Sequence, residues 1–208
     1  MKALFKLDEL DALFNEVNQI EGKKLIWALK STMLSLIQHK FLEEPCEGVT
    51  LLVAACLSNS MKLTAPIEPY NDDVMRRIMR LIVGTFQDLD NSTGSTFGKK
   101  LEILWGMATF KTYVIMFDLE YDDLILQMFQ CFFNIRRHHP DTIIAHMQSI
   151  LLSCMRDHGT IGRELRTRLL SIWRREQLVS PAAYELAQGL VEQNIGLIRR
   201  QLTREELL

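Results

Sequence analysis

The chain of 208 residues has few of the residue types that interrupt helices and strands or form disulfide cross-links. Its 5 Pro and 10 Gly are too few for a linker-rich or disordered protein. Its 4 Cys are too few for a disulfide-dense secreted scaffold. An excess of one charge is also missing, because 24 Lys and Arg stand against 26 Asp and Glu, a formal net charge of -2. Composition alone therefore gives no reason to expect a polyanionic partner.

Long apolar runs are absent as well. Only three apolar residues separate Lys2 from Lys6, so we expect no export signal. The most apolar stretch, 103–117, contains Lys111 and is shorter than the ~18–20 apolar residues that a membrane helix needs. We therefore expect an intracellular, globular protein without membrane spans.

What the sequence does contain is helical periodicity. Apolar residues recur at i, i+3, i+4 and i+7, the pattern of one buried helix face, in several segments. These segments are 49–57, 74–89, 121–133, 143–155 and 184–202. No segment of comparable length alternates apolar and polar residues at period two. The sequence therefore predicts an all-α protein.

The expected helices are spaced like the units of a repeat protein. We predict about nine, near 3–20, 23–39, 47–62, 71–89, 97–117, 120–138, 140–157, 162–175 and 180–203. Every second helix recurs after roughly 40–50 residues, which matches the HEAT and armadillo period. Helix pairs of this size bury their apolar faces only by stacking. The predicted fold is a HEAT/armadillo-type α-solenoid, with residues 1–208 as a single module; an antiparallel helical bundle is the alternative.

Motifs for metal or nucleotide chemistry fail in their details. A calcium loop that starts at Asp118 needs Gly at its sixth place and Glu at its twelfth, but those places hold Asp123 and Phe129. The stretch 94–99 is one residue short of a phosphate loop, and no strand precedes it. The His and Cys residues stand at no recognisable ligand spacing. We therefore expect no catalytic residues, no metal and no cofactor, and we do not expect an enzyme.

Basic residues cluster once, in the helix expected near 162–175. They are Arg163, Arg166, Arg168, Arg174 and Arg175. The apolar side that they flank is formed by Leu165, Leu169, Ile172 and Trp173. The cluster is either a contact surface for a polyanion such as nucleic acid, or a solvated face whose side-chain stems cover the core. No aromatic stacking platform is expected beside it.

A family resemblance begins at Thr64–Val74, which reads Thr-Ala-Pro-Ile-Glu-Pro-Tyr-Asn-Asp-Asp-Val. This segment resembles the N-terminal HEAT repeats of the cohesin-regulating family known as precocious dissociation of sisters, type five, especially its plant members. The likeness continues in order through Phe86–Asp90, Asp118–Ile125 and the helix at 143–152. Because members of that family are several times longer, the resemblance implies that residues 1–208 correspond to the N-terminal portion of the family architecture, either as a fragment or as a shortened paralogue.

The resemblance also implies a function. Members of the family are non-catalytic nuclear scaffolds that associate with cohesin subunits, act on chromosomes through the cell cycle and cell division, and regulate sister chromatid cohesion with a link to DNA repair. Chromatin is then contacted indirectly, through cohesin. The alternatives are a general HEAT adaptor for another assembly, and a nucleic-acid-contacting module that uses the Arg163–Arg175 helix.

The same resemblance places a peptide-docking site at the turn 65–70, where the family has Ala-Pro-Asp-Ala-Pro-Tyr. The residues that this chain keeps are Ala65, Pro66, Pro69 and Tyr70. The middle pair is Ile67 and Glu68, so the chain lacks the Asp that accepts from a basic partner residue, and we expect recognition to shift toward apolar contact. The implied partners are cohesin-release and cohesin-protection factors. A proline-rich connector between two repeats is the alternative interpretation.

Overall fold

A computed structural model describes most of the chain. The described residues are 2–16, 31–38, 41, 46–65, 70–87, 89, 94–135, 139–157, 161–174 and 180–201. Within them every regular element is a helix, which confirms the all-α prediction. No helix among these residues has the length and apolar character needed to cross a membrane.

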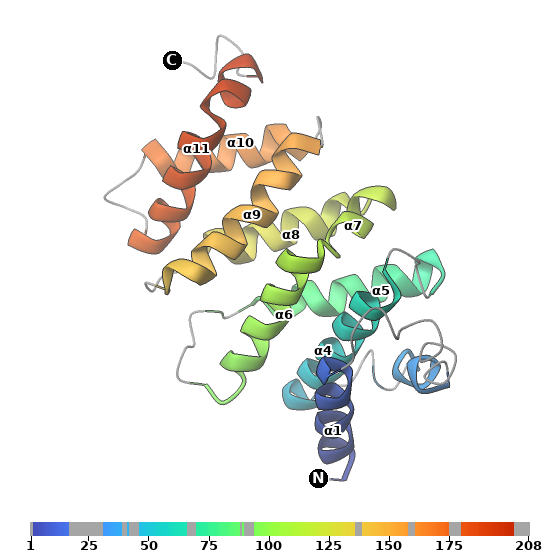
Figure 1. The fold of residues 1–208 in the computed structure, drawn as a ribbon. Coiled ribbons are helices and arrows are strands. Elements are labelled where there is room, and N and C mark those ends of the chain that lie inside the picture. The colour runs from blue at the N-terminus through green and yellow to red at the C-terminus, as the bar shows by residue number, and fades with distance from the viewer. Residues whose placement is uncertain are drawn as a thin grey trace. The chain divides into compact units, whose positions relative to one another are not determined.

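The helices have the following bounds (Figure 1). They are α1 (Lys2–Glu16), α4 (Glu47–Thr64), α5 (Asp72–Gly84), α6 (Phe97–Phe110), α7 (Val114–Asp118), α8 (Asp122–Phe133), α9 (Asp141–Asp157), α10 (Ile161–Arg174) and α11 (Pro181–Gln201). Residues 31–36 are helical as well.

Two helix starts show why the chain turns helical where it does. The side chain of Asn71 accepts a hydrogen bond from the backbone N–H of Val74 at 3.0 Å, which satisfies one of the unpaired donors at the start of α5. At the start of α11, Ser180 Oγ accepts from the backbone N–H of Ala183 at 3.1 Å. Pro181 follows in the first helical position, where its missing N–H costs nothing.

The single helix predicted over 97–117 is instead two helices. Helix α6 ends at Lys111, which adopts the left-handed conformation with φ 54° and ψ 33°, and α7 begins three residues later. A left-handed residue ends a helix because the next N–H turns back toward an earlier carbonyl. The apolar pattern runs through this break without a gap, so periodicity did not reveal it.

Replacing Lys111 by Gly should raise the free energy of unfolding by about 0.5–1 kcal/mol. The left-handed conformation costs a residue with a Cβ roughly 1–2 kcal/mol. Glycine avoids this cost, but it loses more backbone entropy on folding, which offsets part of the gain. Urea denaturation followed by circular dichroism measures the change. Lys111→Val is the matched control and should destabilise, because branching at Cβ worsens the clash. A Lys111→Gly protein that is less stable than the parent would contradict the prediction.

The chain divides into two compact units, of which the first comprises 1–87 and 91–124. Its central element is α4, which packs against α1, α5 and α6 (Figure 1). Of its 18 residues 11 are buried, as expected of a helix that packs against three others. Its buried residues are Leu51, Val53, Ala54, Ala55, Cys56, Leu57, Ser58, Ser60, Met61, Leu63 and Thr64.

The second unit comprises 88–90 and 125–208, and the boundary between the units falls within α8. Here α9, α10 and α11 pack against one another (Figure 1). The stripe predicted over 121–133 is confirmed, because each of its residues is buried. The assignment of residues 1–208 to a single module stays a prediction.

The face predicted for α11 is wrong at its far end. Ile195 was assigned to the buried stripe, but its side chain is 47% exposed. Ala187 and Val191 of the predicted stripe are buried, and so are Ala183, Leu186 and Leu190 next to it. The described side chains of α11 beyond Val191, at 192, 193 and 195, are all exposed, so the described part of its buried face ends at Val191.

Candidate partner-binding site

The predicted docking turn begins where α4 ends. Ala65 is exposed, and its backbone N–H donates to the carbonyl of Met61 at 3.0 Å. With φ -52° and ψ 135°, Ala65 leads the chain out of the helix into extended backbone. Pro66, Ile67, Glu68 and Pro69 lie outside the described residues.

At the other end of the turn, Tyr70 is half-buried and tied to a neighbouring segment. Its hydroxyl donates to the carbonyl oxygen of Met33 at 3.2 Å. Burial raises the pKa of Tyr70 to about 12, and a hydrogen bond with the Ser60 side chain counteracts part of that effect. The turn is therefore held at Tyr70 through contacts to two helical segments. Its role as an interface anchor stays a prediction.

Replacing Tyr70 by Phe should make the stability of the protein less sensitive to alkaline pH. The pKa of Tyr70 is raised from about 10 in the unfolded chain to about 12 in the folded one. The folded state therefore holds a proton that the unfolded state has released, and stability present below pH ~10 is lost as the pH rises toward 12. Urea midpoints at pH 8 and pH ~11 measure the loss. Equal losses in the parent and in Tyr70→Phe would contradict the assignment.

The arginine cluster lies mostly on α10. Arg163, Arg166, Arg168 and Arg174 are in this helix, and Arg175 lies outside the described residues. The side chain of Arg168 is exposed and its guanidinium donates to Asn134 Oδ1 at 3.2 Å. Of the predicted apolar side, Leu169 and Ile172 are buried, but Trp173 is 41% exposed. The prediction is wrong for Trp173, and α10 therefore presents an exposed aromatic ring near its C-terminal end.

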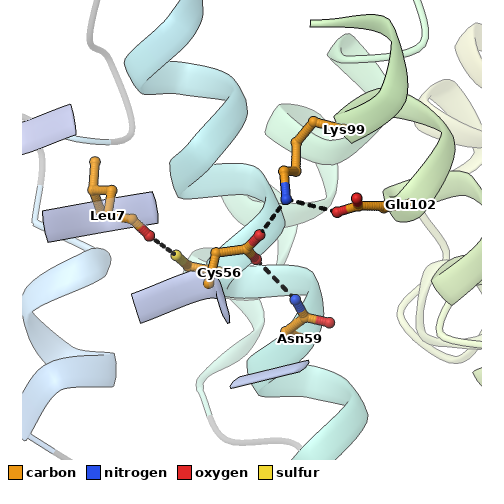
Figure 2. A network of polar contacts seen from close by, with 6 residues as sticks. Leu7, Cys56, Asn59, Lys99 and Glu102 are labelled. Atoms are coloured by element: carbon orange, nitrogen blue, oxygen red, sulfur yellow. Dashed lines mark hydrogen bonds and ion pairs between the residues drawn. The ribbon is translucent and has the colours of Figure 1, made fainter. Parts of the chain in front are cut away.

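A polar network that the sequence analysis missed joins α1, α4 and α6 (Figure 2). The carboxylate of Asp11 in α1 is only 1% exposed. Its Oδ2 accepts from Lys99 Nζ at 2.7 Å and its Oδ1 from Asn59 Nδ2 at 2.8 Å. Lys99 also donates to Glu102 Oε2 at 2.6 Å. The buried charge is thus paired and hydrogen-bonded on both oxygens, as a stable buried carboxylate requires.

The Cys56 thiol and the Lys99 ammonium group are each held in one protonation state at neutral pH. Burial raises the pKa of the Cys56 thiol, which donates to the carbonyl of Leu7 at 3.5 Å, so Cys56 is an inert packing residue. Burial acts to lower the pKa of Lys99, but the hydrogen bonds and negative charges of Asp11 and Glu102 outweigh it and raise that pKa. The ammonium group is therefore charged.

The sequence does contain one signal for this network. Asp11 stands between Leu7 and Phe14 at spacings of four and three, on the buried face of α1. A charge in such a place needs a partner from another element. Periodicity gives no information on which residue supplies it.

A pocket of about 270 Å³ opens next to the network. Its lining residues are Asn15 of α1, Ala55, Ser58 and Asn59 of α4, and Glu102, Ile103, Trp105 and Gly106 of α6. The Trp105 side chain is 47% exposed and meets Phe110 edge to face, with ring centroids 5.9 Å apart. Among the residues with described side chains, no three His, Cys, Asp or Glu come together in a way that could hold a metal ion.

Comparison with known proteins gives one consistent family. The model of the sister chromatid cohesion protein PDS5 family matches residues 3–204. PDS5 homolog C of Arabidopsis thaliana is 30% identical over 198 residues, which cover 95% of this chain and 23% of that protein. PDS5 homolog D of Arabidopsis thaliana is 33% identical over 187 residues, which cover 89% of this chain and 23% of that protein. The chain thus spans less than a quarter of the length of either relative.

A solved structure of the Pds5-Scc1 complex contains a chain with the same fold. The TM-score is 0.79 at 18% sequence identity, and the match covers 95% of this chain and 30% of that one. This likeness confirms the predicted all-α, HEAT-type fold. With the family model matched over nearly its full length, the chain belongs to the sister chromatid cohesion protein PDS5 family.

Proposed function

We propose that the chain is a non-catalytic, cohesin-associated scaffold that regulates sister chromatid cohesion in the nucleus, with a link to DNA repair. The observation that carries the proposal is the family match over residues 3–204. The fold shared with a chain of the Pds5-Scc1 complex supports association with a cohesin subunit. Chromatin is contacted through cohesin.

Purification of the tagged full chain from nuclei, with identification of the proteins that come with it, tests this function. We expect cohesin subunits above the level found with the tag alone. Enrichment of another assembly without cohesin would instead support the general adaptor. Recovery of no cohesin subunit would contradict the proposed function.

Docking of partner peptides at the turn 65–70 is the second part of the proposal. Ala65 is exposed at one end, and Tyr70 is tied to Met33 at the other. Two prolines between these ends restrict the backbone further, so little entropy is lost when a peptide binds. The partners are cohesin-release and cohesin-protection factors, whose contacts here shift toward apolar ones at Ile67.

The double variant Ile67→Asp, Glu68→Ala should bind the cohesin-release-factor peptide about tenfold more tightly than the parent. It restores an anionic acceptor, and a hydrogen bond to a charged group is worth about 1.5–3 kcal/mol. Isothermal titration calorimetry measures both affinities. Glu192→Gln, on the exposed surface of α11, is the control and should bind like the parent. If neither the parent nor the double variant binds the peptide, and Tyr70→Ala leaves the recovered partners unchanged, the turn is only a connector.

The exposed Trp173 favours a second candidate, contact with nucleic acid through α10. An aromatic ring beside arginines can stack on a base while the guanidinium groups contact phosphates. Electrophoretic mobility shifts across a salt series decide this candidate, because affinity that depends on phosphate contacts falls steeply with salt. No shift at low salt would exclude it.

A further inference from the structure

The pocket between α1, α4 and α6 has the size of a single long side chain. At about 270 Å³ it falls just below the range of roughly 300–1,000 Å³ in which proteins bind whole small molecules. Its lining includes the buried apolar residues Ala55 and Ile103 together with polar side chains. A partner would therefore insert one residue and leave its backbone outside.

The charges at the pocket favour a cation. In the adjoining network, two carboxylates, Asp11 and Glu102, stand against the ammonium group of Lys99, and of these three residues Glu102 alone lines the pocket. Asp11 is fully buried, whereas the side chain of Glu102 is 58% exposed and lines the pocket. One oxygen of Glu102 accepts from Lys99. Because a carboxylate has about four lone-pair sites on its two oxygens, Glu102 can accept from a second cation as well.

An amide acceptor lies in the same wall. Asn59 donates its Nδ2 to Asp11, and Figure 2 shows its amide oxygen turned away from that hydrogen bond. Asn59 also lines the pocket. The network thus fixes the orientation of the amide.

Trp105 adds an aromatic surface. Its side chain is 47% exposed while it lines the pocket, and its ring is held edge to face by Phe110. Tryptophan has the strongest attraction of any side chain for a cation over its ring face, and a guanidinium can also stack on it. We propose that this pocket binds a basic side chain, arginine in particular, from a partner protein.

Neither described end of the turn 65–70, Ala65 or Tyr70, is among the residues that line the pocket, and the proposal does not require cohesin. Its failure would leave the proposed function in place. A phosphate or acidic side chain is disfavoured by Glu102, and a purely apolar side chain would leave the acceptors of Glu102 and Asn59 without a gain on binding.

Titration of the full chain with N-acetyl-arginine amide, followed by the indole N–H signals of its tryptophans in nuclear magnetic resonance spectra, tests the proposal. The signal of Trp105 is identified from its loss in Trp105→Phe. We expect arginine amide to shift this signal in the millimolar range, and the neutral isostere N-acetyl-citrulline amide to bind at least about tenfold more weakly. Equal binding of the two probes, or no shift up to about 10 mM arginine amide, would overturn the proposal.

Paired variants separate this site from nonspecific attraction. Glu102→Gln should weaken binding of arginine amide about tenfold and abolish the preference over citrulline. Its control, Glu192→Gln on α11, should leave both unchanged. If Trp173 shifts as strongly as Trp105, or if Glu102→Gln binds like the parent, the pocket is not a specific site. Glu102 is exposed, so its replacement leaves the fold intact, and circular dichroism checks this directly.

Discussion

Replacing Phe129 by Ala should lower the free energy of unfolding by about 3–5 kcal/mol. Phe129 is 2% exposed in α8, and its ring stacks on Phe133 with centroids 6.5 Å apart and planes inclined by 15°. Truncation removes both the buried area and the partner of that stack, and the packed surroundings fill the cavity only in part. Urea denaturation followed by circular dichroism measures the loss.

Leu13→Ala is the control for this substitution. Leu13 is a large apolar residue of α1, but its side chain is 59% exposed, so its loss should cost less than about 0.5 kcal/mol. A loss below ~1 kcal/mol for Phe129→Ala would mean that α8 does not pack by the face that contains Phe129.

Sequence periodicity predicted the buried face correctly in α8 and failed at one position of α11. In α8 each predicted position is a large apolar residue, and each is buried. In α11 the same reasoning mixed Ala187 with Ile195 and failed at Ile195. The difference is physical, since the apolar period indicates which face of a helix is buried but not where along the helix the covering neighbours end, and the described side chains of α11 after Val191 are exposed.

Single backbone conformations and long-range pairs could not be predicted. The left-handed conformation of Lys111 ends α6 inside what was predicted as one helix. A single pair of backbone dihedral angles does not change the spacing of apolar residues in the sequence, so periodicity cannot reveal it. Lys99 and Asp11 are 88 positions apart and meet only after α1 and α6 pack on α4. The exposure of Trp105 is likewise set by which neighbours cover α6.

The two candidate sites also differ in how far the sequence predicts them. The turn 65–70 follows from local sequence and family resemblance, and the structure describes its two ends, Ala65 and Tyr70. The pocket is lined by residues of three helices that are distant in sequence, so no local sequence motif predicts it. Such a site can be recognised only once the packing of the three helices is known.

Replacing Lys99 by Met should destabilise the first unit by about 3 kcal/mol, the lower end of the range for breaking a buried ion pair. Methionine keeps most of the apolar stem, so packing changes little. Asp11, only 1% exposed, would lose its cation and keep one hydrogen bond, from Asn59. The side chain of Lys99 is 23% exposed, and water can reach the site from that side, which is why the lower end applies. Lys6→Met, on the exposed face of α1, is the control and should stay within about 0.5 kcal/mol of the parent.

The double variant Asp11→Leu, Lys99→Met distinguishes the destabilisation caused by an unpaired buried charge from the net contribution of the ion pair to the free energy of unfolding. Burying two apolar side chains in place of the ion pair removes the desolvation penalty, so the double variant should recover most of what Lys99→Met loses. Both changes are measured as urea midpoints under the same conditions. If the double variant were as unstable as the sum of the two single variants, the residues would act independently. Asp11 and Lys99 would then not form the pair that joins α1 to α6.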